Sequence, residues 1–289
     1  PARFRAGGTI RSCTGARPWA TSRCADAGGP DAVQDAGTLG GKVAVVTGTD
    51  TEIGAAVAEA LGRAGASVLL SYYGGPGLAG GVAERLRAAG GRAERYPADL
   101  SRVRDNQALV ARALELWGRL DVFVANAGLT VDKPFLETTE ADWGALSDLN
   151  LKGSFFGAQA AAKAMLAGGR GGRIVFSSSV TGTRALPGLS AYGVTKAGLK
   201  HMASTLGLEL GPYGVTVNAV GIGATTNARN LASDPAFRER WSAVIPAGRD
   251  GRPEDVAAAV LFLASPGAAM VNGHTLMIDG GWTHAGRVP

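Results

Sequence analysis

Short apolar runs alternate with segments of helical periodicity from Gly41 onward, and this alternation restricts the fold more than any other feature. Lys42–Thr47 reads KVAVVT, and residues 53–63 then carry apolar side chains at helical spacing. Because the runs are apolar throughout rather than at every second residue, helices should cover both of their faces. The sequence therefore predicts a single doubly wound parallel α/β sheet of about seven strands, with helices on both faces. We expect strands over residues 42–47, 66–71, 93–96, 120–125, 173–178, 215–220 and 274–278, and helices over 53–63, 78–89, 101–117, 140–167, 191–210 and 253–264.

The 289 residues divide into a short unusual segment and one domain. Residues 1–25 contain five arginines and no acidic residue, so much of the net charge of +5 is local. Such charge alone does not indicate a nucleic-acid partner. Residues 1–38 lack periodicity and the apolar run of a secretory signal, and we expect a disordered extension; a transit peptide, or upstream sequence absent from the mature protein, is the alternative. Residues 39–289 then form one domain, for which a 46% hydrophobic composition supplies a core.

Several classes of protein are not expected from the composition. Both cysteines lie within residues 1–38 and the three histidines are scattered, so we expect neither a disulfide scaffold nor a metal site. The most apolar stretch, residues 151–166, contains two lysines and is shorter than the roughly 20 apolar residues that a spanning helix needs. We therefore expect no membrane partner and no nucleic-acid partner.

A glycine-bearing turn follows the first strand and opens the first helix. Residues 47–54 read TGTDTEIG, and backbone N–H groups at such a turn, together with the helix dipole, can bind a pyrophosphate. The turn resembles that of the classical short-chain dehydrogenases/reductases, which reads TGxxxGxG. The resemblance implies a Rossmann-like fold in which the cofactor is bound here by Gly48, Asp50, Thr51, Ile53 and Gly54.

The turn departs from the family pattern at Glu52, which replaces the middle glycine. Two interpretations stay open: the carboxylate rests against the helix N-terminus, where the dipole favours it, or it repels the cofactor phosphates. Ala125 is a second departure, because it takes the first place of the family's Asn-Asn-Ala-Gly segment.

Further stretches resemble the same family. Asp99 and Leu100 follow the third strand, where the family places an Asp near the adenine, and residues 272–281 resemble its closing strand and turn. The resemblance runs from about residue 42 to 281. It implies additional cofactor contacts from Asp99, Leu100, Asn126, Ala127 and Gly128.

The end of the second strand bears on which nicotinamide cofactor is used. Ser71 and Tyr72 lie there and no carboxylate does, so a ribose 2′-phosphate has room and NADP (NADPH) is slightly favoured. Asp50 and Thr51 occupy the positions where NADP-preferring relatives tend to carry a Ser and an Arg, and NAD therefore remains possible.

Tyr192 and Lys196 are four residues apart at the start of a predicted helix, so their side chains share one face. A tyrosine normally ionises near pH 10, and it exchanges protons at neutral pH only when a close positive charge favours the phenolate. Ser179 lies thirteen residues before the tyrosine, at the end of the fifth strand. This spacing is similar to the Ser…Tyr-x-x-x-Lys triad of the same family.

The resemblance assigns catalytic functions to Asn150, Ser179, Tyr192 and Lys196. Ser179 is expected to donate a hydrogen bond to the substrate carbonyl oxygen and Tyr192 to give that oxygen its proton. Lys196 is expected to favour the phenolate and, with Tyr192, to contact the nicotinamide ribose. Asn150 is expected to fix a water that links the lysine to solvent, whereas Ser177 and Ser178 are interpreted as structural.

The segment after the sixth strand is the least similar to the family. Ile222 replaces a proline, and Gly223 and Thr225 are the expected contacts of the nicotinamide amide. Residues 224–250 are expected to form a substrate lid, whose arginines suit an anionic or polyhydroxy substrate. A solvated amphipathic helix anchored in the core by Trp241 is the alternative.

The sequence thus predicts an NAD(P)-dependent oxidoreductase, a ketoreductase or secondary alcohol dehydrogenase, that transfers a hydride between nicotinamide and the carbonyl carbon of a small molecule. A 3-oxoacyl-thioester reductase is one alternative. The other is a non-catalytic nucleotide-binding regulator on the same fold, to which the departures at Glu52, Ala125 and Ile222 point. The resemblance further implies a cytoplasmic homotetramer.

Overall fold

The computed structural model describes residues 37–75 and 77–285. Residues 1–36, which include most of the predicted extension, lie outside this range. The described residues form a seven-stranded sheet in the order β3-β2-β1-β4-β5-β6-β7, and every pairing is parallel. The predicted fold class is therefore confirmed. The strands are β1 (Val43–Val46), β2 (Ser67–Tyr72), β3 (Ala93–Pro97), β4 (Val122–Ala125), β5 (Gly172–Ser179), β6 (Val215–Ile222) and β7 (Thr275–Ile278).

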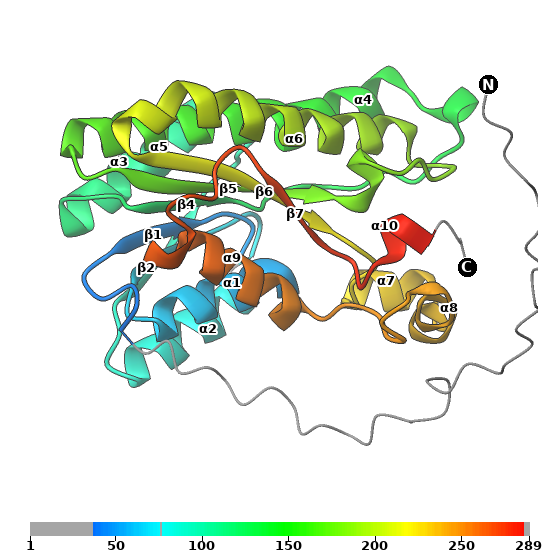
Figure 1. The fold of residues 1–289 in the computed structure, drawn as a ribbon, viewed down its shortest axis with the longest axis horizontal. Coiled ribbons are helices and arrows are strands. Elements are labelled where there is room, and N and C mark those ends of the chain that lie inside the picture. Colours follow the sequence, from blue (N-terminus) through cyan, green and yellow to red (C-terminus); the bar gives the residue numbers. More distant parts are fainter. Residues whose placement is uncertain (1–36, 76, 286–289) are drawn as a thin grey trace, which may run out of the picture. The chain divides into compact units, whose positions relative to one another are not determined.

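Helices cover both faces of the sheet (Figure 1). Alternate side chains of β1 show why its run is apolar throughout: Ala44 and Val46 belong to the buried cluster on one face, and Val43 and Val45 to that on the other. The first face is packed by α1 (Glu52–Arg63), α2 (Gly77–Ala88) and α9 (Pro253–Ala264), and the second by α3 (Val103–Trp117), α5 (Ser154–Gly168) and α6 (Ser190–Leu210).

The long helix predicted over residues 140–167 is interrupted. The structure has α4 (Glu140–Leu146), then a π-helical segment, η2 (Ser147–Gly153), and then α5. Gly153 packs against the carbonyl oxygen of Leu100 so closely that a Cβ has no room there. Periodicity along one segment carries no information on such a contact, which explains why the interruption was not predicted.

The predicted helix start at Ser101 is wrong. Helix α3 begins at Val103, and its N-cap is Arg102 rather than the serine. The hydroxyl of Ser101 instead donates to the carboxylate of Asp99 at 2.6 Å. The serine therefore organises the turn after β3 and not the helix.

The predicted lid segment contains two short helices, α7 (Ala228–Ser233) and α8 (Phe237–Val244). Trp241 packs edge-on against Trp282 of α10 (Trp282–Ala285), with ring centroids 5.5 Å apart. Trp241 is partly buried and packs against the core cluster of Val180, Ile245 and Trp282, and a lid function of this segment stays a prediction. Short turns of 3-10 helix complete the chain at η1 (Phe135–Glu137), η3 (Val180–Gly182), η4 (Gly211–Tyr213) and η5 (Pro266–Ala268).

Strand order reverses between β1 and β4, and the chain leaves these two strands toward helices on opposite faces of the sheet. Ligands of doubly wound sheets bind at this position. Among the described residues, no helix combines the length and apolar character needed to cross a bilayer.

Candidate active site

A cavity of about 580 Å³ opens at the carboxyl edge of the sheet, between the turns that follow the strands and helix α7. Helix α7 belongs to the predicted lid, residues 224–250, which is called the lid below. Nearly all of the predicted site residues line it. Those are Gly48, Asp50, Thr51, Ile53, Ser71, Tyr72, Asp99, Leu100, Asn126, Ala127, Gly128, Ser179, Tyr192, Lys196, Gly223 and Thr225. The two predicted residues outside the lining are Gly54 and Asn150.

The turn after β1 is packed too closely for side chains at its glycines. Gly48 has φ of +67°, and a Cβ on it would lie 2.8 Å from Cα of Ala127. Gly54 packs against the carbonyl oxygen of Gly48, with no space for a Cβ. Gly54 therefore allows the helix to approach the turn closely. It does not line the cavity, so its predicted direct contact with a cofactor has no support there.

Thr47 and Asn126 brace this turn against β4. The Thr47 hydroxyl accepts hydrogen bonds from the backbone N–H of Asn126 at 2.8 Å and of Ala127 at 2.9 Å. The Asn126 amide donates to the carbonyl oxygens of Thr47 at 3.0 Å and Gly48 at 3.2 Å. The polar groups of Asn126 are thus used within the protein, and they fix the position of the glycine turn.

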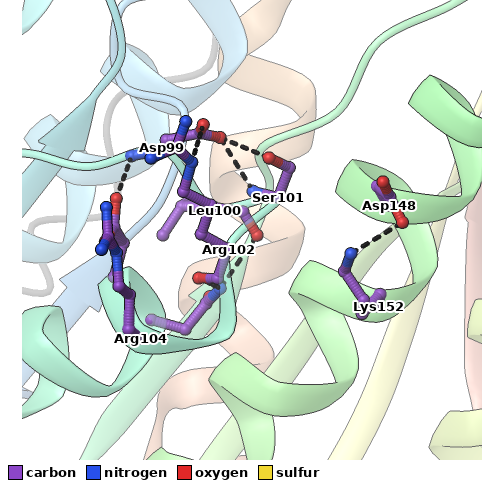
Figure 2. Close-up of polar contacts among 9 residues, drawn as sticks. Asp99, Leu100, Ser101, Arg102, Arg104, Asp148 and Lys152 are labelled. Carbon is purple, nitrogen blue, oxygen red and sulfur yellow. Dashed lines mark hydrogen bonds and ion pairs between the residues drawn. The ribbon is translucent and has the colours of Figure 1, made fainter.

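The adenine end predicted from the family pattern surrounds Asp99 (Figure 2). Hydrogen bonds from the Ser101 hydroxyl lower the pKa of Asp99, and Arg102, whose Nε lies 3.0 Å from the carboxylate, lowers it further. Asp99 is therefore a carboxylate held in one orientation at the wall of the cavity. Figure 2 also shows Asp148 paired with Lys152 on the neighbouring helical segment, at 2.7 Å.

The side chains at the carboxyl end of β2 lie where the ribose of a dinucleotide is predicted to bind. The buried hydroxyl oxygen of Ser71 faces this region, and within the described residues it has no hydrogen-bond partner. Tyr72 and Tyr73 line the cavity beside it. The Asp50 carboxyl group lies beside this strand end, where burial raises its pKa and a hydrogen bond from the backbone N–H of Tyr73 opposes that rise. The Ser71 hydroxyl has no partner within the described residues and is free to bond a ribose, and β2 itself carries no carboxylate that would repel a phosphate. The residues present therefore suit a dinucleotide.

Lys196 lies in the part of the cavity that carries the predicted catalytic residues, called the catalytic end below. Its Nζ donates to the carbonyl oxygen of Ser177 at 2.8 Å and lies 5.4 Å from the ring centroid of Tyr192. The side chain is buried, and across residues 37–75 and 77–285 no carboxylate forms an ion pair with it. The Ser178 hydroxyl donates to the carbonyl oxygen of Lys196 at 2.7 Å, in agreement with a structural function for this serine.

Ser179 ends β5 and is buried beside the cavity. Its Oγ accepts a hydrogen bond from the backbone N–H of Thr181 at 3.2 Å. That bond uses a lone pair of the hydroxyl and leaves its hydrogen available to donate into the cavity. The arrangement suits a donor to a substrate oxygen.

Asn150 lies behind the cavity, in the middle of the π-helical segment. Its amide nitrogen donates to the carbonyl oxygen of Leu129 at 3.0 Å and to the Thr195 hydroxyl at 3.1 Å, and its oxygen accepts from the N–H of Leu129 at 2.9 Å. The side chain is fully buried. These contacts use the side-chain amide to brace the loop after β4, so any water-positioning function remains a prediction.

Residues of the predicted lid segment reach the cavity, and one of them is an arginine, as the sequence predicts. Arg229 donates to the Thr130 hydroxyl at 3.2 Å, across the cavity from α7 to the loop after β4. Asn230 and Asn227 donate to the carbonyl oxygen of Thr225 at 2.8 and 3.3 Å. No local pattern marks Asn227 and Asn230, because their common site forms only when distant loops meet. Other cavity residues that the sequence did not single out include Leu129, Thr130, Ala145 and Leu149.

Glu52 has a partner that neither interpretation of the sequence anticipated. It is the first residue of α1, and its Oε1 accepts a hydrogen bond at 2.7 Å from the backbone N–H of Ala228, the first residue of α7. The side chain lines the cavity. The residue that replaces the family glycine therefore links the glycine turn to the lid.

Within the described part of the chain, no group of three or more His, Cys, Asp or Glu side chains is placed to hold a metal ion.

Comparison with known proteins places this geometry in context. A family model described as enoyl-(acyl carrier protein) reductase matches residues 48–283. The 2-dehydro-3-deoxy-D-gluconate 5-dehydrogenase of Escherichia coli is 36% identical over 247 residues, which cover 85% of this chain and 96% of the relative. The 3-oxoacyl-[acyl-carrier-protein] reductase of Synechocystis is 38% identical over 246 residues, covering 84% and 97%.

A solved structure is similar over the same range. The short chain dehydrogenase from Burkholderia cenocepacia, determined in complex with NADP, superposes with a TM-score of 0.80 at 35% sequence identity. The match covers 85% of this chain and 99% of that one. The similarity thus extends through the glycine turn, the catalytic end and the lid.

Proposed function

The chain belongs to the short-chain dehydrogenase/reductase family and is an oxidoreductase that acts on CH–OH and C=O groups; we propose that it interconverts the carbonyl and secondary alcohol of a small polyhydroxy or anionic compound, with NADP(H) preferred to NAD(H). The observation that carries this proposal is the single cavity that joins Ser179, Tyr192 and Lys196 to the polar lid. A carbonyl held there meets a hydroxyl donor, a proton source and a fixed cation.

Each catalytic side chain has one proposed task. Reduced nicotinamide, when bound, supplies the hydride. Ser179 donates a hydrogen bond to the carbonyl oxygen, where negative charge grows in the transition state. Tyr192 gives that oxygen its proton, and Lys196 holds positive charge beside the tyrosine ring at 5.4 Å from its centroid. In the oxidative direction the proton moves from the alcohol to the tyrosine.

The substrate class is proposed from the lid. Arg229 lines the cavity. Among the described residues, its guanidinium donates a hydrogen bond only to the neutral hydroxyl of Thr130. An arginine with donors to spare recognises carboxylates well. The asparagines of the lid add groups that suit hydroxyls. The similarity to a 2-dehydro-3-deoxy-D-gluconate dehydrogenase agrees with an oxidised sugar acid.

A 3-oxoacyl thioester is the second candidate substrate. It is favoured by the 38% identity to a 3-oxoacyl-[acyl-carrier-protein] reductase. The two candidates make different demands on Arg229: a sugar acid needs it for its carboxylate, whereas a thioester carbonyl does not.

The test is the consumption of NADPH, and separately of NADH, by the purified protein with keto-sugar acids, neutral keto-sugars, cyclic ketones and 3-oxoacyl thioesters. We expect turnover of the keto-sugar acids, faster with NADPH, and loss of about 10³-fold in rate for Tyr192→Phe. Arg229→Met should raise the KM for the acid about tenfold and change that for a neutral sugar little. Turnover of thioesters alone would replace the first candidate by the second, and coenzyme binding without any turnover would favour a regulator.

We further propose that the protein is a cytoplasmic homotetramer. Support comes from large apolar side chains exposed on the long helices, namely Phe155 of α5 and Val194 and Leu208 of α6, which are 40%, 53% and 81% exposed. Light scattering coupled to size-exclusion chromatography measures the assembly. Leu208→Glu is expected to reduce it, and a monomeric wild-type protein would contradict the proposal.

A further inference from the structure

The bond between Glu52 and Ala228 joins two parts of the chain that are 176 positions apart. Glu52 opens α1 at the glycine turn, and Ala228 opens α7 in the lid. Both the glutamate and the neighbours of Ala228, Asn227 and Arg229, line the same cavity. The bond therefore crosses from the proposed cofactor side of the cavity to its proposed substrate side.

Helix α7 has few other attachments. None of its residues is fully buried, and of its apolar side chains only Leu231 is half-buried, so apolar packing holds it weakly. Its contacts are polar: Asn227 and Asn230 donate to the carbonyl oxygen of Thr225, and Arg229 donates to Thr130. A hydrogen bond to a carboxylate is stronger than a neutral one. The contact with Glu52 is the only one of these that uses an ionisable acceptor.

The Ala228 N–H also has no acceptor inside its own helix. The first N–H groups of a helix lack intrahelical partners, and the side chain of the N-cap, Asn227, accepts from Asn230 rather than from Ala228. Glu52 supplies the missing acceptor. A glycine at position 52, as the family pattern has, offers no side chain that could do so.

We propose that Glu52 is a positioning residue that tethers the lid to the glycine turn and thereby fixes Arg229 over the substrate side of the cavity. Because the carboxylate holds the backbone of Ala228, it restricts the movement of the next residue, Arg229. The departure from the family pattern then serves substrate binding. The carboxylate that lines the cofactor side is engaged by the lid instead of being free to repel phosphates.

Two substitutions separate a tether from a charge effect. Glu52→Gln keeps an oxygen that accepts from Ala228 and removes the charge, whereas Glu52→Ala removes both. Glu84→Gln is the matched control, because Glu84 is an exposed carboxylate on α2 that does not line the cavity. If the tether operates, the Gln variant lies between the wild type and the Ala variant, because it keeps the acceptor but loses the charge that strengthens the bond. If only charge matters, Gln and Ala behave alike.

The first readout is hydrogen exchange of the peptide that contains residues 226–232, measured by mass spectrometry on the full chain without cofactor. We expect about tenfold faster exchange in Glu52→Ala, the loss of one charged hydrogen bond, with at most about threefold in Glu52→Gln. Glu84→Gln should not change it. Unchanged exchange in the Ala variant, or equal acceleration in Gln and Ala, overturns the proposal. This readout needs no turnover, so it stands even if the proposed substrate is wrong.

The second readout rests on the proposed function. With an acidic substrate, Glu52→Ala should raise KM about fivefold or more and leave kcat within about twofold, and Glu52→Gln should restore most of the loss. The NADPH dissociation constant, measured by fluorescence titration, should not improve in either variant by more than about threefold. Equal tightening of NADPH binding in Gln and Ala, with no change in substrate KM, would make Glu52 a repulsive charge and reject the tether.

Discussion

At the amino and carboxyl ends of the same sheet, two buried charged side chains, Asp121 and Lys196, differ in their partners. At the amino end, Asp121 precedes β4, accepts from the N–H of Val43 at 2.9 Å and forms a two-bond pair with Arg119 at 2.6 and 2.8 Å. At the carboxyl end, the described residues supply no carboxylate partner to the buried Lys196 and no hydrogen-bond partner to the hydroxyl of Ser71.

The difference indicates what each end contributes. A buried charge whose bonds are satisfied stabilises the fold or costs it little, whereas unpaired polar groups reduce stability. Proteins keep such groups where activity requires them. Unpaired atoms alone do not separate the two ends, because the buried Arg173 Nε and Thr216 Oγ1, at the amino ends of β5 and β6, also lack a partner among the described residues. The carboxyl end differs in that Lys196 and Ser71 line the cavity, which is the proposed site of binding and reaction.

The largest expected effect tests the carboxyl end. Lys196→Met should lower turnover about 10³-fold, because the cation beside Tyr192 is lost. The melting temperature should stay the same or rise, since an apolar side chain of similar length replaces a buried charge that has no counter-ion. Steady-state kinetics and calorimetry on the same preparation measure both. A variant that loses stability instead would identify the lysine as part of the structural framework.

The second prediction tests the amino end. Asp121→Asn should lower the free energy of unfolding by about 2 kcal/mol at pH 7 and leave turnover per folded molecule unchanged. Burial alone raises the pKa of Asp121, but the bonds from Arg119 and the Val43 N–H outweigh it, so the pKa is lowered overall.

The sign of that shift predicts a pH dependence. A carboxyl group with a lowered pKa in the folded state contributes stability above its unfolded pKa of about 3.9 and loses it as pH falls. The gap between wild type and Asp121→Asn in urea unfolding should therefore narrow below about pH 4. A gap that is constant from pH 7 to pH 3 would show that the carboxylate charge is not the source of the stability.

The third prediction concerns coenzyme choice at the carboxyl end. The double variant Asp50→Ser, Thr51→Arg should raise the ratio of kcat/KM for NADPH over NADH about tenfold, because a carboxylate is removed and a phosphate-binding guanidinium added. Asp50→Asn alone is the control and should give a smaller rise. If neither variant changes the ratio, the ribose 2′ group lies away from these residues.

The smallest expected effect on stability comes from Ser71→Ala. Because the hydroxyl has no partner in the described protein, its removal should change the free energy of unfolding by less than about 0.5 kcal/mol. The same variant should weaken NADPH binding about fivefold if the hydroxyl serves the cofactor. A stability loss like that of Asp121→Asn would remove the contrast between the two ends.

Most of the fold followed from local pattern. Continuous apolar runs predicted buried parallel strands, and the structure places Ala44 and Val46 on one face and Val43 and Val45 on the other. Such predictions succeed because burial on two faces leaves a direct trace in residue type. The helix interruption at residues 147–153 left no such trace; Gly153, at its end, packs closely against Leu100, a contact between segments distant in the chain.

The candidate site divides in the same way. Spacing and strand ends identified Ser179, Tyr192 and Lys196, because parallel strands bring their carboxyl ends to one edge. The sequence did not reveal that the side-chain amide of Asn150 forms hydrogen bonds with the backbone N–H and carbonyl oxygen of Leu129.

The sequence by itself determined the sheet, its helical cover and the residues that meet at its carboxyl edge, because periodicity, glycine turns and fixed spacing are properties of neighbouring residues. Only the tertiary structure decided that Glu52 contacts Ala228 and that Arg229 reaches Thr130. Those contacts join loops that are distant in the chain. Their geometry depends on how helices and turns pack around the whole sheet, which no local pattern records.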